Sequence, residues 1–183
     1  MTRAVAFIRA INVGGHTVKG ARLVELFEDA GLDSVSTHAN SGNVLFDLPR
    51  GRRDGLERRL TERLSDALGF PADTFVRTSA EVERVIASDP FPGIATTPET
   101  RTQVGFMSDQ PTEAARQAVL VLATDLPHDH LAFEGRELYW RYEGRMTGSA
   151  LGGGPQLAKT LGVPVTFRAT TMLAKVDSLL RGA

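Results

Sequence analysis

The sequence predicts an α+β protein that contains two ferredoxin-like β-α-β-β-α-β units. Short apolar runs alternate with amphipathic stretches, the same order of patterns occurs twice, and one proline-rich segment, residues 89–101, separates the two series. A repeated order of elements is typical of an internal duplication. We expect the first unit and its linker to span residues 1–97, and the second unit with a closing helix to span residues 98–183.

The first series begins with a continuous apolar run at residues 4–8, which is typical of a strand buried on both faces. Apolar stripes at helical spacing predict two main helices, ended by Gly31 and Gly69. Thr78 and Glu81 have the spacing of a capping box, which predicts the start of a short helix. The expected elements are a strand at 4–8, a helix at 23–30, strands at 35–38 and 44–48, a helix at 56–68, a strand at 74–76 and a short helix through 86.

The second series repeats this order after the linker. Glu134-Gly135-Arg136 predicts a hairpin turn, and Gly162 is expected to end a short helix. The expected elements are a strand at 104–107, a helix at 115–122, strands at 131–133 and 137–142, a helix at 157–161, a strand at 163–167 and a closing helix at 172–180.

The composition excludes several classes of protein. The chain has no cysteine, which removes disulfides, thiol catalysis and thiolate metal sites together. Arg3 and Arg9 interrupt the first residues too early for a signal peptide, and no apolar run reaches the eighteen or so residues of a membrane helix. We therefore expect a cytoplasmic protein without a membrane partner.

Several motifs occur in one order along the chain and together resemble the bacterial domain of unknown function 1697 family. The resemblance runs from about residue 5 to residue 180; it implies a duplicated ferredoxin-like fold and no biochemical function. The motifs are Arg9-Ala10-Ile11-Asn12-Val13-Gly14-Gly15, Asn40-Ser41-Gly42-Asn43-Val44-Leu45-Phe46, Asp89-Pro90-Phe91-Pro92, Gly135-Arg136-Glu137-Leu138-Tyr139 and Leu161-Gly162-Val163-Pro164.

The chain departs from the usual pattern of this family at several positions. The family usually carries glycine where Ala10 stands and lysine where Ala150 stands. It usually has an Asn-Trp-Asn run between the residues that match Arg168 and Lys175, whereas this chain has Ala169-Thr170-Thr171. If the C-terminal segment carries an activity shared by the family, the resemblance implies that this chain has weakened or lost it.

The loop after the first strand is the candidate binding site. Gly14 and Gly15 leave backbone N–H groups open near the start of a helix, where an anion can be held. If the first and third strands are neighbours, as the ferredoxin-like order implies, further side chains converge there. We predict that a small anionic or phosphorylated ligand binds to this loop, with no cofactor. The side chains are those of Arg9, Asn12, Ser41 and Asn43.

A purely structural reading of the same residues stays open. Both glycine-containing segments can be turns that need positive φ, and Arg9 can be paired with an acid. The loop matches neither a P-loop nor the G-x-G-x-x-G pattern of dinucleotide sites.

An enzyme that uses the same cleft is the second hypothesis. His16 and His38 can approach each other through the loop near Gly15, and either can carry a proton. The run His128-Asp129-His130 is expected to be a solvated loop whose spacing does not suit a metal site. No catalytic motif accompanies the histidines, so no reaction class stands out and no metal is expected.

An RNA-binding module is the third hypothesis. Strand alternation places Trp140 and Tyr142 on one face and Tyr139 with Arg141 on the other. The segment from 144 to 176 has four basic residues and no acid, namely Arg145, Lys159, Arg168 and Lys175. The aromatic run of an RNA-recognition motif is absent, however, and the net charge is only −1. Core packing is therefore the favoured reading of these aromatic residues, and nucleic acid is not an expected partner.

Overall fold

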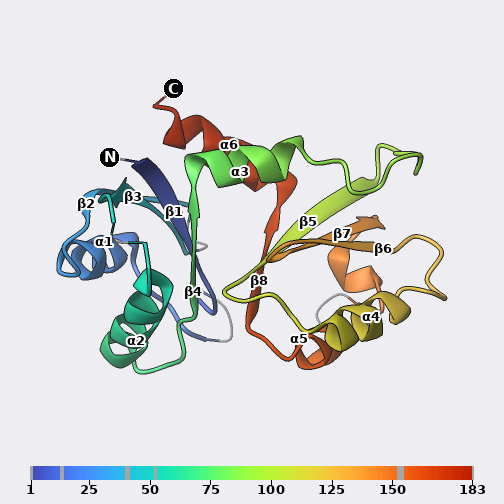
Figure 1. Ribbon diagram of the computed structural model, residues 1–183, viewed down its shortest axis with the longest axis horizontal. Helices are drawn as coiled ribbons and strands as arrows, with labels where there is room; N and C mark the ends of the chain where they lie inside the picture. The colour runs from blue at the N-terminus through green and yellow to red at the C-terminus, as the bar shows by residue number, and fades with distance from the viewer. Residues whose placement is uncertain (1, 13–14, 40–41, 52, 152–154, 183) are drawn as a thin grey trace. The chain divides into compact units, whose positions relative to one another are not determined.

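A computed structural model describes residues 2–12, 15–39, 42–51, 53–151 and 155–182 of the chain (Figure 1). The chain divides into two compact units, which we call the first unit (Met1–Ala87 with Leu173–Ala183) and the second unit (Ser88–Met172). Within the described residues, each unit contains one four-stranded antiparallel sheet, and the chain forms six α-helices.

The first unit follows the elements that its apolar spacing predicts. Leu56, Leu60 and Leu64 form a buried stripe along one helix, and Gly69 ends that helix with φ 76°. The elements are β1 (Thr2–Ile8), α1 (Gly20–Glu28), β2 (Asp33–His38), β3 (Asn43–Leu48), α2 (Leu56–Leu68), β4 (Thr74–Thr78) and α3 (Ser79–Ala87).

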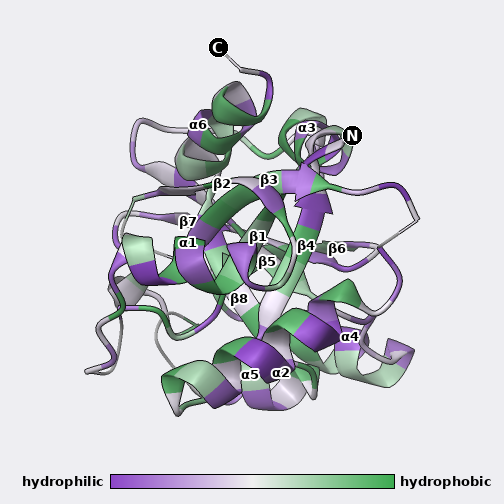
Figure 2. Cartoon of the chain, turned by 90° about the vertical axis from the view of Figure 1, so that its left-hand side faces the viewer, coloured by the Kyte–Doolittle hydropathy of each residue, from purple (hydrophilic) through white to green (hydrophobic). Residues whose placement is uncertain are grey.

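The first sheet has the strand order β2-β3-β1-β4, with β1 antiparallel to both β3 and β4. Because side chains alternate along a strand, Ala4, Ala6 and Ile8 share one face of β1. They form a single buried cluster with Phe27 of α1 and Leu60 of α2, so these two helices cover that face. Figure 2 shows β1 and β4 largely in the colour of hydrophobic residues, while the helices carry both colours.

The second unit repeats this architecture. Its sheet has the order β6-β7-β5-β8, which is the order of the first sheet with each strand replaced by its counterpart. Two apolar clusters pack against it, one around Met107 and Leu138 and one around Trp140 and Leu151. The elements are β5 (Thr100–Met107), α4 (Glu113–Val121), β6 (His130–Glu134), β7 (Glu137–Glu143), the 3-10 turn η1 (Met146–Gly148), α5 (Pro155–Leu161), β8 (Val165–Ala169) and α6 (Thr170–Leu180), the last of which begins in this unit.

Strand register identifies equivalent positions in the two sheets. Val5 of β1 is paired with Arg77 of β4, and Val104 of β5 is paired with Arg168 of β8. Both arginines are buried, and each donates an Nη1 hydrogen bond of 2.9 Å to the carbonyl of the residue before it. The repeated pattern is consistent with a duplicated unit.

All the predicted helices and strands are present, and apart from the start of β5 their ends lie within three residues of the predicted ones. Two of the shifted strand boundaries have a clear physical reason. β5 begins at Thr100, inside the predicted linker, because Thr100 and Arg101 are already paired with β7 although neither is apolar. β8 begins at Val165 instead of residue 163, directly after Pro164, which has no N–H group for the strand ladder.

The environment of Asp129 also differs from the prediction. This residue is buried instead of solvated, because its Oδ1 accepts hydrogen bonds from Trp140 Nε1 at 2.7 Å and from Ser149 Oγ at 2.6 Å. The neighbouring His130 is already part of β6. Asp129 therefore helps to hold the indole of Trp140 in the core.

Candidate functional site

Arg9 and Gly15 are the described residues of the predicted loop site that are open to solvent. The side chain of Arg9 is 46% exposed, and its Nη1 donates to Asp73 Oδ2 at 2.9 Å. A carboxylate of the chain therefore already binds one side of this guanidinium group. Gly15 is exposed and has φ 88°, and no atom of the described residues outside its own chain neighbours lies within 4 Å of the position that a Cβ would take.

Asn12 and Asn43 hold the backbone of their own turns. Asn12 accepts a hydrogen bond of 2.9 Å from the amide of Val18, and Asn43 donates one of 3.2 Å to the carbonyl of His38. Asn43 is fully buried. Two further predicted site residues, Gly14 and Ser41, lie outside the described residues.

Gly42 has a structural role in the same region. Its φ is 69°, and an added Cβ would lie 2.9 Å from the carbonyl oxygen of Ile8. The amide of Ile8 donates a 2.8 Å hydrogen bond to the carbonyl of Gly42, which holds the two turns together. The close approach of these backbones explains the glycine without a ligand.

Of the two histidines in the enzyme hypothesis, one stacks on an aromatic ring and the other lies at the end of a strand. The ring of His16 stacks on Phe70 with centroids 4.0 Å apart, and His38 ends β2. Among the described residues, no three histidine or carboxylate side chains are grouped so that they could hold a metal ion.

The aromatic residues of β7 alternate as predicted, and all three are buried. Trp140 and Tyr142 pack together on one face with ring centroids 4.7 Å apart, and the exposed fractions of Tyr139, Trp140 and Tyr142 are 2%, 2% and 4%. Their rings are therefore not open to stack on bases. Burial also lowers the pKa of Arg168 to about 10, and this arginine of the basic segment is 9% exposed.

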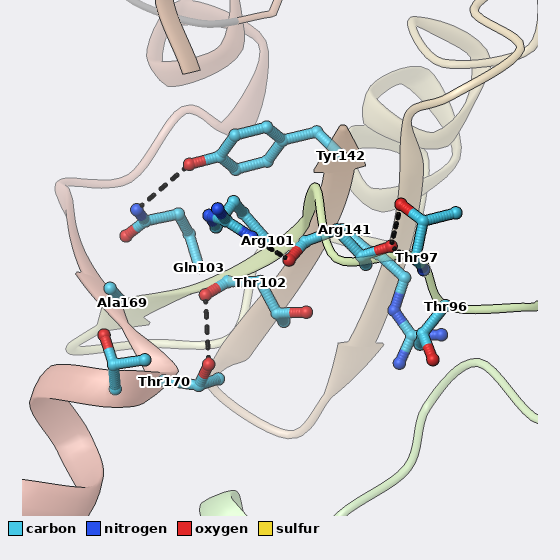
Figure 3. A pocket seen from close by; sticks show the side chains of 11 residues that line it. Thr96, Thr97, Arg101, Thr102, Gln103, Arg141, Tyr142, Ala169 and Thr170 are labelled. Atoms are coloured by element: carbon cyan, nitrogen blue, oxygen red, sulfur yellow. Dashed lines mark hydrogen bonds between the residues drawn. The ribbon is translucent and has the colours of Figure 1, made fainter. Parts of the chain in front are cut away.

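A pocket of about 330 Å³ lies at one end of the second sheet, and we call it the threonine pocket (Figure 3). It forms where β5 begins, β7 ends and β8 leads into α6. Its lining is rich in hydroxyl groups and includes two arginines. The lining residues are Thr96, Thr97, Thr100, Arg101, Thr102, Gln103, Arg141, Tyr142, Ala169, Thr170 and Thr171.

The register of three strands brings these residues together. Arg101 is opposite Tyr142 and Thr102 is opposite Arg141, while Gln103 on the same strand is opposite Ala169. Figure 3 shows two of the hydrogen bonds that fix the walls, from Gln103 Nε2 to Tyr142 Oη at 3.3 Å and from Thr170 Oγ1 to the carbonyl of Thr102 at 3.4 Å.

The two arginines of the threonine pocket differ in how their donors are used. Arg101 is exposed, and its Nη1 donates to the carbonyls of Pro98 and Thr100, both at 2.8 Å. The Arg141 side chain is only 14% exposed and lies over the ring of Phe91, 4.7 Å from the centroid.

The donors of Arg141 are poorly satisfied. Its Nη1 lies 3.4 Å from the carbonyl of Ile94, and its Nη2 lies 3.6 Å from Asp89 Oδ1. Its Nε is buried without a hydrogen-bond partner in the described part of the chain. A buried donor that lacks an acceptor is costly, so an anion close to this guanidinium would be stabilised.

The sequence contained one signal for this pocket, although it was not predicted. Ala169-Thr170-Thr171, the run that departs from the family pattern, lies in the lining. The basic residues of the 144–176 segment do not line it, and its two arginines lie outside that segment. The threonines near residue 97 were assigned to a linker, and nothing in the sequence indicates that they face β7.

Comparisons with known proteins give a family and a fold. The sequence model of the family described as "Protein of unknown function (DUF1697)" matches residues 1–139. No curated protein matches the chain. The solved structure of the conserved bacterial protein SP0830 from Streptococcus pneumoniae is similar, with a TM-score of 0.73 and 21% sequence identity over 99% of both chains. At that identity the likeness shows the fold alone. Every helix among the described residues is too short or too polar to cross a bilayer.

Proposed function

The chain belongs to the DUF1697 family of proteins of unknown function, and we propose that it binds a small anionic ligand in the threonine pocket. The observation that carries the proposal is a pocket whose lining contains two arginines and six threonines. No acidic side chain is among the described residues that line the pocket. Carboxylates outside the lining contact it only at longer range, Asp89 at 3.6 Å from Arg141 Nη2 and Glu143 at 3.4 Å from Thr97 Oγ1, so an anion could compete for these donors.

The volume and position of the pocket support the same proposal. About 330 Å³ lies at the lower end of the range for small-molecule sites. The first turn of α6, which begins at Thr170, carries no acidic residue, and its backbone N–H groups favour negative charge. The arginines supply the larger share of the attraction, because Arg141 is mostly buried and charge interactions strengthen away from water.

The loop around Gly15 is the second candidate place for the same function. It is favoured by the accessible backbone of Gly15 and by the half-exposed side chain of Arg9. We rank it below the threonine pocket because Asp73 already pairs with Arg9 at 2.9 Å. The first prediction from the sequence, an anion held at Arg9, Asn12, Gly14, Gly15, Ser41 and Asn43, thus stays a prediction.

A thermal-shift experiment separates the two places. Acetate, citrate, inorganic phosphate and glycerol phosphate are added to the purified chain, and a ligand that binds the folded state raises the Tm by mass action. We expect Arg141→Gln and Arg101→Gln to remove the rise, and Arg9→Gln and the exposed control Arg22→Gln to retain it. The exposed Arg101 provides a second test if Arg141→Gln does not fold. Loss of the rise in Arg9→Gln alone would move the site to the loop, and no rise with any anion would reject the function.

For the architecture, we propose that both units are ferredoxin-like and arose by duplication of one β-α-β-β-α-β segment. The equivalent strand orders and the matching buried arginines Arg77 and Arg168 support this. On this view, the threonine pocket is a feature that one copy has and the other has closed.

A further inference from the structure

One edge of the second sheet is formed by β6 (His130–Glu134). Within the described residues, β6 pairs with β7 alone, so one of its sides has no neighbouring strand. All five of its residues are at least partly exposed, whereas four of the seven residues of β7 are buried. A strand edge of this kind presents backbone N–H and C=O groups to which a further strand can bind.

The other edge strands of the two described sheets are buried or irregular. β4 and β8 consist mostly of buried residues. β2 is exposed, but its pairing with β3 is interrupted between Asp33 and Ser36, and Ser34 has φ 54°. Such an irregularity bends a strand and protects its edge from further pairing. β6 has an unbroken register with β7 and contains neither lysine nor proline, so it is the edge best suited to accept another strand.

Strand alternation decides which backbone groups of β6 point to its open side. The carbonyl of Arg136, directly before β7, accepts a 3.1 Å hydrogen bond from the amide of Met107 in β5. Because the backbone groups of a strand alternate between its two neighbours, the odd-numbered residues of β7 direct theirs to β6. In the register, these residues are opposite the even-numbered residues of β6. The odd-numbered residues of β6 therefore direct their N–H and C=O groups to the open side, and these are Leu131 and Phe133.

We propose that β6 pairs with β6 of a second copy of the chain, antiparallel and centred on Ala132, so that the chain forms a symmetric dimer. This register places Leu131 of each copy opposite Phe133 of the other, and every open N–H and C=O group of β6 then has a partner. A register shifted along the strand would set Leu131 or Phe133 opposite a residue outside β6. The open backbone groups therefore select the register that is centred on Ala132.

The side chains of β6 fit the same register. On one face, His130 of each copy lies opposite Glu134 of the other, and an imidazole N–H can donate to a carboxylate across the pair. Ser88 Oγ already donates to Glu134 Oε1 at 2.7 Å, but Glu134 is exposed, and a carboxylate accepts several hydrogen bonds. On the other face, Leu131 lies opposite Phe133; both pack against the core of their own unit and are still partly exposed. The side chains thus select the register independently of the backbone.

Sedimentation velocity tests the dimer and its centre. One short strand is a small interface, so the full chain is measured from about 1 μM to 1 mM, the range of weak complexes. Ala132→Glu sets two carboxylates opposite each other at the symmetry axis, and Ala132→Ser is the small uncharged control. We expect the glutamate to weaken the dimer at least tenfold and the serine to leave it unchanged. A wild-type chain that stays monomeric throughout, or equal dimerisation of all three proteins, would overturn the proposal. Circular dichroism and the Tm confirm that each variant is folded.

Exchanging the charges of the cross-strand pair tests the side chains. His130→Glu sets carboxylates opposite each other on both sides of the axis, so we expect it to weaken the dimer at least tenfold. Adding Glu134→Lys restores opposite charges in both pairs and should return the Kd to within roughly threefold of the wild-type value. A double variant that dimerises no better than His130→Glu alone would overturn the register.

Amide hydrogen exchange of the wild-type chain tests the register without any substitution. Between dilute and concentrated samples, we expect exchange to slow at least tenfold at the amides of Leu131 and Phe133, which gain partners in the dimer. The amides of the even-numbered residues of β6 are bonded to β7 in the monomer as well and should change much less. A dimeric sample in which Leu131 and Phe133 exchange as fast as in the monomer would overturn the proposal.

Discussion

The starts of α3 and α6 occupy equivalent places in the two units but are built with opposite chemistry. At α3 the chain satisfies its own donors, because Glu81 binds Arg53 and Thr78 with bonds of 2.8 to 3.0 Å. At α6 the residue that strand register makes equivalent is Met172, and a pocket with two arginines opens beside the helix. The same topology can therefore hold an internal ion pair at one end of the sheet in the first unit and a pocket at the equivalent end in the second.

The largest effect on stability is expected from removing the internal ion pair at the start of α3. Glu81→Gln removes a carboxylate that two donor groups share, and it leaves the partly buried Arg53 without its partner. We expect a loss of about 1–3 kcal/mol in the free energy of unfolding, measured by urea denaturation. The matched change Met172→Gln at the start of α6 should alter the free energy of unfolding by no more than about 0.5 kcal/mol. Similar losses in both variants would contradict the proposed contrast between the two ends.

The pH dependence of stability sharpens the same contrast. Burial by itself raises the pKa of the Glu81 carboxyl, but the hydrogen bonds from Arg53 and Thr78 outweigh it. Because the pKa of Glu81 is lowered in the folded state, its contribution is present above the ordinary pKa of glutamate, near 4.3, and is lost as the pH falls through the folded value. The stability gap between the wild type and Glu81→Gln should therefore be full at pH 7 and shrink below about pH 4. Denaturation curves at pH 7, 5 and 3 measure it. A gap that is constant over this range would mean that Glu81 acts by packing alone.

A smaller effect is expected from the capping hydroxyl, which can be removed at Thr78 in the first unit and added at Ala169 in the second. Thr78 accepts a 3.3 Å hydrogen bond from the amide of Glu81, so Thr78→Ala should cost about 1 kcal/mol. Ala169→Thr introduces the hydroxyl at the equivalent place in the second unit and should change stability by less, since no carboxylate completes the capping box there. Thermal unfolding of the two variants, each against the wild type, checks both expectations. A loss of stability in Ala169→Thr as large as that in Thr78→Ala would contradict the expectation that the hydroxyl matters only beside the carboxylate.

The smallest effect is expected at the other end of the sheets. Ala10 follows β1 and has φ 62°, a conformation that glycine adopts more easily, whereas its counterpart Asp109 has no positive φ. Ala10→Gly should therefore raise the stability by up to about 1 kcal/mol, and Asp109→Gly should lower it by about 0.4–1 kcal/mol through the added freedom of the unfolded chain. Urea denaturation of both variants measures the two signs. An equal loss in both would show that φ at Ala10 is not strained.

Features that depend on local spacing could be predicted from the sequence. The capping box of Thr78 and Glu81 and the alternation of residues 138–142 are examples, because each involves residues a few positions apart. Helices with a clear apolar stripe, such as α2, were predicted at their observed bounds.

Features that depend on strand register could not be predicted from the sequence. The partner of Arg9 is Asp73, 64 positions away, and no local pattern selects it from the other acids. Likewise, Arg101 and Arg141 come to line one pocket because β5 and β7 pair in one particular register. The threonine pocket is the product of that register, whereas the loop at Gly15 was visible in advance because glycines mark turns.

The membership of residues 173–183 in the first unit has a consequence for how the protein is made. Arg181 binds Glu83 of α3 at 3.2 Å, so the first unit takes a segment from the far end of the chain. At synthesis rates of about 5–20 residues per second, the interval between residues 87 and 183 lasts roughly 5–20 s. During that time the ribosome holds a first unit that lacks its last segment, and the second unit emerges before the first can be completed. The first unit can therefore close only after residues 173–183 have been synthesised, and a nascent-chain assay for chaperone binding should report the delay.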